Sequence, residues 1–269
     1  MRLIYREAGE LKFSFGETSN ELRPQYSVTK TFTALAAIIA ESEGLWSLED
    51  HLSEHLRRQG IVPRSRIGSD LKLRHLLSML GGDRQARMFQ SERKNLGSQY
   101  TIKSLFNDVD FYVHPAGTRF LYTNAGHYII GVLLQQLSGR RLSDYWSAFF
   151  NYGDYEWEED SEGCQFGASG LFISTEHLDL FAQALRGAAP EFLDPKHLKR
   201  MTTIQYHDSA GQNYGLGIWI DSRGNYRADG TNGQSVIISA DRRKSLTMNA
   251  NNPNPKNLRQ YCFEQFFKM

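Results

Sequence analysis

An apolar run near the amino terminus constrains the fold more than any other stretch of this sequence. Thr31-Phe32-Thr33-Ala34-Leu35-Ala36-Ala37-Ile38-Ile39-Ala40 follows directly on Tyr26-Ser27-Val28-Thr29-Lys30. A helix this apolar has to be buried, and Gly44 suits the left-handed position that ends it. Because the helix begins near Ser27, the side chains of Ser27 and Lys30 lie three residues apart on one face and can touch.

A serine hydroxyl beside a lysine amine indicates nucleophilic catalysis. The hydroxyl is a poor nucleophile until a base takes its proton, and a lysine amine can be that base only when burial or a nearby cation lowers its pKa from about 10.4. The first turn of a buried helix also offers free N–H groups and the positive end of the dipole to a developing oxyanion. Ser27 and Lys30 are therefore candidate catalytic residues.

The spacing Ser-x-x-Lys is weak evidence by itself, because it occurs three times in the chain. Ser91 to Lys94 is a charged, solvated stretch, and Ser69 to Lys72 reads as the cap and first turn of a helix. Only the copy at Ser27 leads into an apolar helix that shields a lysine from water.

The charge balance and the cysteine count narrow the class of protein. Lys and Arg total 31 against 30 Asp and Glu, without a basic stripe, so we expect no nucleic-acid partner. No apolar run is long enough to cross a bilayer, and the first ten residues lack the hydrophobic core of a secretory signal. Cys164 and Cys262 read as reduced thiols. We expect a cytoplasmic protein, with a removed signal or anchor as the open alternative and the oligomeric state undetermined.

A second motif suggests a metal. His51-x-x-Glu54-His55 matches the inverted zinc-protease pattern, in which two histidines four residues apart face one ion. A zinc hydrolase would need a third ligand and a water-bearing cleft, and nothing nearby supplies a distinctive ligand. We favour a solvated helix face and predict no metal and no other cofactor.

Two further stretches carry polar groups suited to a substrate. In Tyr122-Thr123-Asn124, the phenol can donate and accept protons while the carboxamide holds a substrate carbonyl. The alternative is a buried tyrosine beside an asparagine in a turn. In Ala228-Asp229-Gly230-Thr231-Asn232-Gly233, the glycines allow the backbone to approach a ligand and present an N–H.

Periodicity predicts strands at both ends of the chain. Leu3 to Phe15 alternates around Ala8-Gly9-Glu10, as in a short hairpin. Further strands are predicted at 214–221, 235–240 and 245–250, and further helices at 71–80, 128–137, 176–185, 195–201 and 257–269. In the last helix we expect four aromatic residues to pack on the sheet: Tyr261, Phe263, Phe266 and Phe267.

The order of these segments resembles the serine β-lactamase and penicillin-binding-protein superfamily, especially the branch of class C β-lactamases, D-alanyl-D-alanine carboxypeptidases and related esterases. The resemblance runs from about Phe13 to Asn251. It includes Glu43-Gly44-Leu45-Trp46-Ser47-Leu48-Glu49-Asp50, Leu73-Arg74-His75-Leu76-Leu77-Ser78, Pro115-Ala116-Gly117-Thr118-Arg119-Phe120-Leu121-Tyr122-Thr123-Asn124 and Gly170-Leu171-Phe172-Ile173-Ser174-Thr175.

The resemblance implies an α/β fold of the α+β type, β-lactamase/transpeptidase-like, with an antiparallel sheet flanked by helices and an all-helical lobe. Residues 1–50 and 165–269 would form the α/β lobe and residues 51–164 the inserted helical lobe, with the site between them.

The same resemblance implies roles for the candidate residues. Ser27 would be the acylated nucleophile, Lys30 its base partner, and Tyr122 the proton relay to the leaving group. Asn124 would hold the substrate amide. The oxyanion would lie between the N–H of Ser27 and that of Thr231, which follows Gly230, with Asn232 as the alternative to Thr231.

Two departures from the superfamily pattern bear on the substrate. Where relatives place Lys-Thr-Gly or His-Thr-Gly, this chain has Ala228-Asp229-Gly230, without the cation that meets the carboxylate of penicillins or of a D-Ala terminus. The strands before Ser27 and the segment 151–163 are also short, which predicts a more open cleft.

These observations predict a serine hydrolase that cleaves a small ester, amide or peptide through an acyl-enzyme. Its substrate would be a small molecule or peptide, β-lactams included, and the missing cation favours a neutral ester or amide. The alternative is a catalytically weak or inactive penicillin-binding-like protein with a binding or regulatory role.

Overall fold

The computed structural model describes residues 1–269 except 65–69, 97–99, 152, 191–192, 253 and 268–269. Its contacts divide the chain into a sheet unit and a helical unit. The sheet unit comprises Met1–Thr31, Trp146–Trp157 and Ser169–Met269, and the helical unit comprises Phe32–Tyr145 and Glu158–Ala168. In this division, as in the predicted lobes, the helical part is inserted in the sequence between segments of the part that contains the sheet. The predicted lobe boundaries, at 50/51 and 164/165, stay a prediction.

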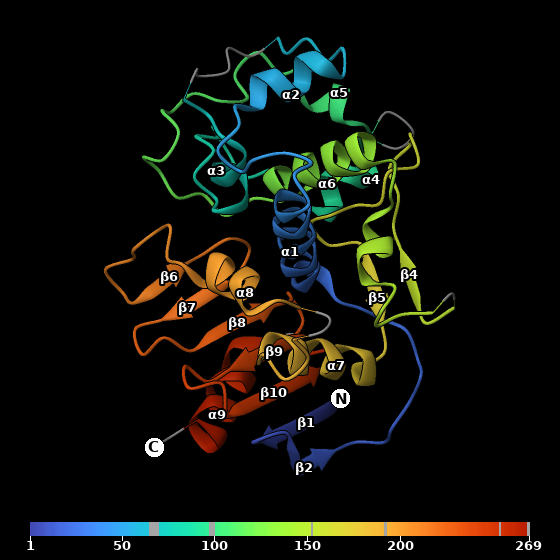
Figure 1. The fold of residues 1–269 in the computed structure, drawn as a ribbon, viewed down its shortest axis with the longest axis vertical. Coiled ribbons are helices and arrows are strands. Elements are labelled where there is room, and N and C mark those ends of the chain that lie inside the picture. Colours follow the sequence, from blue (N-terminus) through green and yellow to red (C-terminus); the bar gives the residue numbers. More distant parts are fainter. Residues whose placement is uncertain (65–69, 97–99, 152, 191–192, 253, 268–269) are drawn as a thin grey trace. The chain divides into compact units, whose positions relative to one another are not determined.

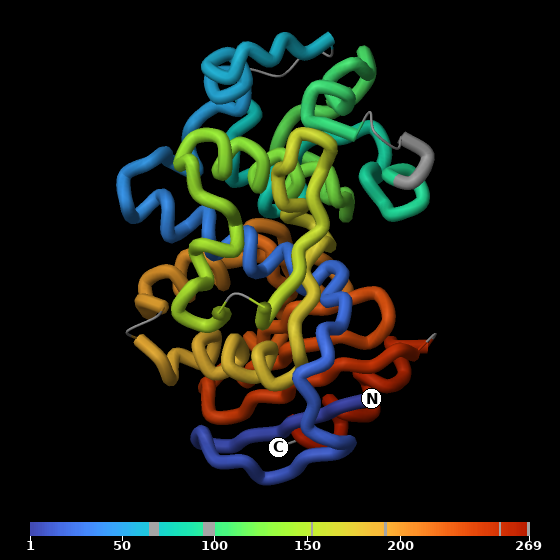
Figure 2. Tube along the Cα trace, turned by 90° about the vertical axis from the view of Figure 1, so that its right-hand side faces the viewer, coloured from blue at the N-terminus to red at the C-terminus, as the bar shows by residue number. Residues whose placement is uncertain are grey.

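The sheet unit contains an antiparallel sheet of seven strands among the described residues, which confirms the predicted fold class (Figure 1). Strand β1 (Arg2–Glu7) pairs with β2 on one side and with β10 on the other, so the first strands lie beside the last (Figure 2). The full order is β2 (Glu10–Phe15), β1, β10 (Lys244–Asn249), β9 (Ser235–Ile238), β8 (Tyr226–Asp229), β7 (Trp219–Asp221) and β6 (Gln212–Tyr214). A smaller sheet has the order β3 (Arg23–Pro24), β5 (Leu171–Ile173) and β4 (Tyr155–Trp157).

Two helices cover opposite faces of the large sheet. Leu246 and Met248 of β10 belong to the apolar cluster that helix α9 (Pro255–Phe266) joins through its phenylalanines. Thr247, between them, donates instead to Asp179 of helix α7 (Thr175–Leu185) at 3.0 Å. Because successive side chains of a strand point to opposite faces, α9 and α7 lie on different sides. Helix α8 (Pro195–Thr202) lies between α7 and α9 in the sequence.

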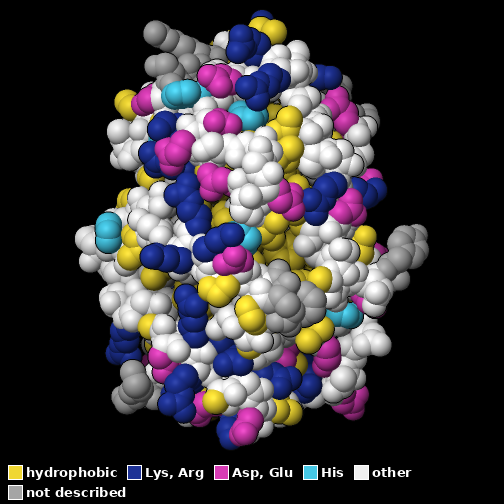
Figure 3. All heavy atoms as spheres, viewed as in Figure 1, with side chains coloured by type: hydrophobic (Ala, Val, Ile, Leu, Met, Phe, Trp, Pro, Cys, Tyr) yellow, Lys and Arg dark blue, Asp and Glu magenta, His cyan; other side chains and the backbone are white. Residues whose placement is uncertain are grey.

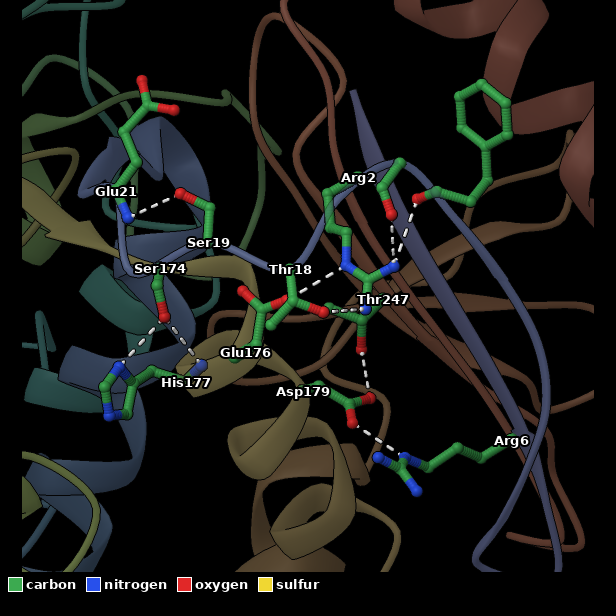
Figure 4. A network of polar contacts seen from close by, with 12 residues as sticks. Arg2, Arg6, Thr18, Ser19, Glu21, Ser174, Glu176, His177, Asp179 and Thr247 are labelled. Carbon is green, nitrogen blue, oxygen red and sulfur yellow. Dashed lines mark hydrogen bonds and ion pairs between the residues drawn. The ribbon is translucent and has the colours of Figure 1, made fainter.

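The α7 interface with the sheet is polar (Figure 4). Asp179 is 4% exposed and accepts hydrogen bonds from Arg6 Nε at 2.7 Å and from Thr247 Oγ1. One turn earlier, Arg2 Nε donates to Glu176 Oε1 at 3.0 Å. Charged hydrogen bonds are geometrically specific, so this network fixes the position of α7 on strands β1 and β10.

The helical unit contains most of the long apolar helix. Helix α1 (Thr29–Ser42) begins in the sheet unit, is buried along most of its length, and is followed by Gly44 at φ +78°, as predicted. Among its described residues the unit also contains α2 (Leu52–Arg58), α3 (Leu73–Leu77), α4 (Gln90–Leu96), α5 (Ile102–Leu105) and α6 (Ala125–Ser138). The 3-10 helix η3 (Leu142–Trp146) follows, where the first stretch of the unit ends at Tyr145. A Cβ at Gly126 would lie 2.5 Å from the carbonyl oxygen of Leu76, so glycine is needed where α6 crosses α3.

Two strand predictions were wrong. The stretch 214–221 is not one strand, because it turns sharply between β6 and β7, where Gly215 N–H donates to Ile218 O at 2.9 Å. A Cβ at Gly215 would lie 2.3 Å from Met201 O, so this turn requires glycine. Periodicity predicts no strand at 226–229, but these residues form β8, paired with both β7 and β9. Pairing on both sides overrides the low strand propensity of Ala228 and Asp229.

Two helix predictions need smaller corrections. The helix predicted at 71–80 is shorter, because α3 ends at Leu77 and Met79 adopts the left-handed conformation at φ +62°. The carboxy-terminal helix exists as α9, but Tyr261 is 61% exposed and does not pack on the sheet, whereas Phe263, Phe266 and Phe267 do. Its predicted end at Met269 lies outside the described residues.

The surface carries both signs of charge. Lys and Arg are interspersed with Asp and Glu over the face that Figure 3 shows, as expected from a net charge of +1. Among the described residues, no helix has the length and apolarity that a membrane span requires.

A buried carboxyl group distinguishes the helical unit. Asp83 is 4% exposed, and its backbone forms a bridge to Tyr112. Burial raises the pKa of Asp83 to about 7, although a backbone hydrogen bond and the charge of Arg87 act in the opposite direction. The carboxyl is therefore largely protonated in the folded protein at mildly acidic pH.

We expect Asp83 to make the folded protein less stable as pH rises. Its pKa is near 3.9 in the unfolded chain and about 7 in the folded one, so between these values the folded state retains a proton that the unfolded state loses. The free energy of unfolding should fall through this window, by at most roughly 4 kcal/mol. Urea denaturation at pH 5 and pH 8 should show a smaller fall for Asp83→Asn than for wild type, and an identical fall in both proteins would contradict this role.

Candidate active site

Ser27 and Lys30 are in contact, as their spacing predicts. Ser27 lies in the 3-10 turn η1 (Tyr26–Val28), which leads directly into α1. Lys30 Nζ donates to Ser27 Oγ at 2.9 Å. The lysine side chain is 1% exposed, whereas Ser27 is half-buried. Ser27 is therefore partly exposed, while its lysine partner is shielded from water.

The residue before Ser27 has a strained backbone. Tyr26 adopts φ +45°, in the left-handed region that costs a residue with a side chain about 1–2 kcal/mol. Such conformations persist only where the surroundings hold them, and they cluster at functional sites.

Gln25 holds the strained turn in place. Its side chain is fully buried, and its Nε2 donates to Arg23 O at 2.8 Å and to Ile173 O at 3.1 Å. Its backbone N–H donates to Leu171 O at 2.8 Å. Strand β5 therefore fixes the chain just before the nucleophile candidate.

The first turn of α1 is also tied to the sheet unit. Thr29 Oγ1 accepts from Leu171 N–H at 3.3 Å, and Thr31 Oγ1 donates to Gly217 O at 2.8 Å. Both threonines are buried. Because the turn is anchored on both sides of Ser27, the serine cannot move independently of strand β5.

The glycine-rich segment after β8 lies against the same turn. A Cβ at Gly230 would be 2.8 Å from the carbonyl oxygen of Gln25, so only glycine fits there. Asn232 Nδ2 donates to the hydroxyl of Tyr26 at 3.4 Å. Thr231 is exposed, and within the described part of the chain no acceptor bonds to its N–H. A main-chain donor is therefore available close to the nucleophile turn.

Tyr122 and Asn124 lie in the helical unit, in the segment that precedes α6. Asn124 is 4% exposed, and its Nδ2 donates to Met88 O at 2.9 Å. Leu121 N–H donates to Met79 O at 2.9 Å, and Asn124 N–H to Arg87 O at 3.1 Å. These bonds hold the half-buried Tyr122 in a rigid segment. The structure thus brings Ser27, Lys30, Gly230 and Thr231 together in the sheet unit, and Tyr122 with Asn124 in the helical unit.

The other motifs have structural explanations. The solvated helix face that we favoured was wrong for His55, which is 3% exposed and whose Nε2 lies 3.1 Å from Asp50 Oδ2. His51 is the residue that precedes α2. Among the described residues, no group of three or more His, Cys, Asp or Glu side chains is arranged to hold a metal ion. Of the other two Ser-x-x-Lys copies, the one that starts at Ser91 lies within α4. Ser69, the first residue of the remaining copy, lies outside the described residues.

Sequence reasoning missed Gln25 and Tyr26. Neither belongs to a recognisable motif, and a positive φ at a tyrosine cannot be read from its neighbours. One signal was available for Gln25. Its amide side chain comes shortly before an apolar helix, where a buried polar group needs hydrogen-bond partners.

A family model described as Beta-lactamase matches residues 16–148, a range that contains Ser27, Lys30, Tyr122 and Asn124. No curated protein sequence matches the chain.

Solved structures resemble the whole chain. The octameric penicillin-binding protein homologue from Pyrococcus abyssi has a TM-score of 0.79 at 18% identity, over 98% of this chain and 72% of that one. The β-lactamase/D-alanine carboxypeptidase from Yersinia pestis has a TM-score of 0.78 at 16% identity, over 99% and 93%. The D-stereospecific amidohydrolase from Streptomyces sp. has a TM-score of 0.71 at 19% identity, over 94% and 89%. At these identities the likeness shows a shared fold.

We expect Gly230→Ala to slow the reaction of Ser27 with a fluorophosphonate. The added methyl group must displace either the Gln25 carbonyl or the loop that carries Thr231, and a displacement of about 1 Å can cost on the order of 10²-fold. Labelling rates measured by intact mass would check this. Gly215→Ala is the matched control, because its methyl would clash with Met201 O elsewhere in the sheet unit. Equal slowing in both variants would show general destabilisation and contradict a specific role for Gly230.

Proposed function

Since the chain belongs to the serine β-lactamase and penicillin-binding-protein superfamily, we propose that it is a serine hydrolase that cleaves a small ester, amide or peptide through an acyl-enzyme on Ser27. The observation that carries this proposal is the 2.9 Å contact between Ser27 Oγ and the buried Lys30 Nζ. The carboxypeptidase and the amidohydrolase among the similar structures support acyl transfer to water.

The first step is attack by Ser27. In its unprotonated form, the Lys30 amine accepts the hydroxyl proton as Oγ bonds to the substrate carbonyl carbon. The negative charge that develops on the carbonyl oxygen is stabilised by the N–H groups of Ser27 and Thr231. A proton transfer of this kind contributes about 10²–10⁴-fold, and one oxyanion donor about 10²–10³-fold.

The later steps involve the residues of the helical unit. As the carbon–leaving-group bond breaks, Tyr122 delivers a proton to the departing alcohol or amine. Water then attacks the acyl-enzyme, Tyr122 takes the proton of the water, and Ser27 leaves as Lys30 returns the hydroxyl proton that it took in the first step. Asn124 holds the substrate amide or ester carbonyl through its carboxamide.

The substrate has an uncharged acyl group in this proposal. The position that the superfamily pattern gives to a cation is Ala228, which is 2% exposed. The next residue, Asp229, accepts from Arg227 Nε at 2.8 Å and from Ser235 Oγ at 2.7 Å, so its carboxylate is already engaged. Without a cation for a substrate carboxylate, neutral esters and amides should react better than penicillins or peptides ending in D-Ala.

A second candidate function is a binding or regulatory protein with weak turnover. The missing cation at Ala228 favours this alternative as well, because it removes a usual contact with the substrate. A fold also does not dictate an activity. We also propose a cytoplasmic location, in keeping with Cys164 and Cys262, which are both free thiols.

Replacing Ser27 tests the hydrolase proposal. We expect Ser27→Ala to lower the turnover of p-nitrophenyl butyrate by on the order of 10³-fold or more, because the acyl-enzyme cannot form. Wild type should gain the mass of one fluorophosphonate adduct and hydrolyse nitrocefin more slowly than the ester. The matched control is Ser91→Ala, which alters another Ser-x-x-Lys copy and should behave as wild type. Full turnover in Ser27→Ala would exclude the proposal, and unchanged mass without turnover in wild type would favour the binding protein.

A further inference from the structure

Helix α9 covers only part of its face of the large sheet. The apolar cluster beneath it draws on β1, β10 and one residue of β9, Ile237. Beyond that cluster, a hollow of about 420 Å³ lies between α9 and strands β6 to β9. We call it the α9 hollow. Its lining includes Asp221, Arg227, Ile237, Lys256, Arg259 and Phe263.

Regular structure positions these side chains. Arg227 of β8 and Ile237 of β9 are direct cross-strand partners, so their side chains share one face of the sheet. Lys256, Arg259 and Phe263 are spaced by three and four residues along α9 and therefore share one face of the helix. The hollow is thus built from rigid elements, and its apolar lining is Phe263 together with Ile237, which is 1% exposed.

The positive charge in the hollow exceeds the negative charge. Three cations line it against one carboxylate, Asp221. That carboxylate already accepts from Arg223 N–H, Asn225 N–H and Asn225 Nδ2 at 2.8–2.9 Å.

The two arginines are held in place by other groups. Arg227 donates to Asp229 at 2.8 Å and to Gln212 at 2.6 Å, and Arg259 donates to Gly230 O at 3.3 Å. Lys256 is exposed and forms no ion pair or hydrogen bond with the described residues. Its ammonium is therefore the charge that is free to meet a ligand, with two pre-oriented guanidinium groups beside it.

We propose that the α9 hollow binds a small organic anion with an apolar body, such as an aryl-alkyl carboxylate. The carboxylate lies between Lys256 and Arg259, and the apolar body packs on Phe263, above the buried Ile237. The volume is within the range of about 300–1,000 Å³ that small-molecule sites occupy. A neutral analogue of the same shape lacks the ionic contact and binds more weakly.

Arg259 links the α9 hollow to the candidate active site. It donates to the carbonyl of Gly230, and Thr231 is the next residue. A carboxylate that engages Arg259 competes with this bond and with the 3.7 Å ion pair between Arg259 and Asp229. A ligand bound in the α9 hollow should therefore change the reactivity of Ser27. This effect rests on the proposed function, but the binding of the ligand does not rest on it.

Calorimetry on the full chain at low salt tests the binding, with 4-phenylbutyrate and its neutral amide as probes. We expect wild type to bind the carboxylate at least about 10-fold more tightly than the amide, a preference that salt weakens. Lys256→Gln and Arg259→Gln should lose this preference. Lys199→Gln, which removes an exposed charge on α8, should keep it. Unchanged melting temperatures would show that the variants fold.

Three results would overturn the binding proposal: no preference for the carboxylate in wild type, a preference retained in Lys256→Gln, or an equal loss in Lys199→Gln. The link to Ser27 has a separate readout. Saturating 4-phenylbutyrate should change the rate of fluorophosphonate labelling in wild type and leave it unchanged in Lys256→Gln. Binding without any change in the wild-type rate would refute the link while leaving the site in place.

Discussion

The contact between Ser27 and Lys30 depends on a strained turn that the rest of the sheet unit holds in position. Tyr26 has a positive φ, and Gln25 before it is bonded through both its backbone and its side chain to the segment 171–173. Gly230 approaches the same turn so closely that no side chain fits. The nucleophile candidate, its amine partner and a free main-chain N–H are therefore positioned by one set of contacts.

These contacts explain why the ends of the chain belong to one unit. Strand β1 pairs with β10, and the turn at Ser27 is bonded to residues beyond position 170. The site cannot form until the carboxy-terminal third of the chain is in place. The polar interface of α7, centred on Asp179, adds directional bonds between the same two parts of the sequence.

Sequence patterns predicted those parts of the fold that are determined by interactions between residues close together in the sequence. The α1 helix, its glycine stop at Gly44 and the first hairpin follow from apolar periodicity and turn chemistry. The Ser27–Lys30 contact follows from helix geometry, because residues three apart share a face. Each of these features involves residues close together in the sequence.

Features that depend on distant partners could not be read from the sequence. Strand β8 exists because β7 and β9 pair with it on both sides, although Ala228 and Asp229 are poor strand formers. The role of Gln25 depends on the carbonyl of Ile173, which lies 148 residues later. Similarly, Arg259 meets Gly230 only because α9 folds back over the sheet.

The proposed chemistry depends on the activation of Ser27 by Lys30, and the rate of serine acylation measures this activation. Lys30→Met keeps an unbranched side chain in the buried position but removes the amine. We expect the second-order rate constant for fluorophosphonate labelling of Ser27 to fall by about 10²–10⁴-fold in this variant, with the melting temperature maintained. A folded Lys30→Met protein that labels as fast as wild type would contradict it.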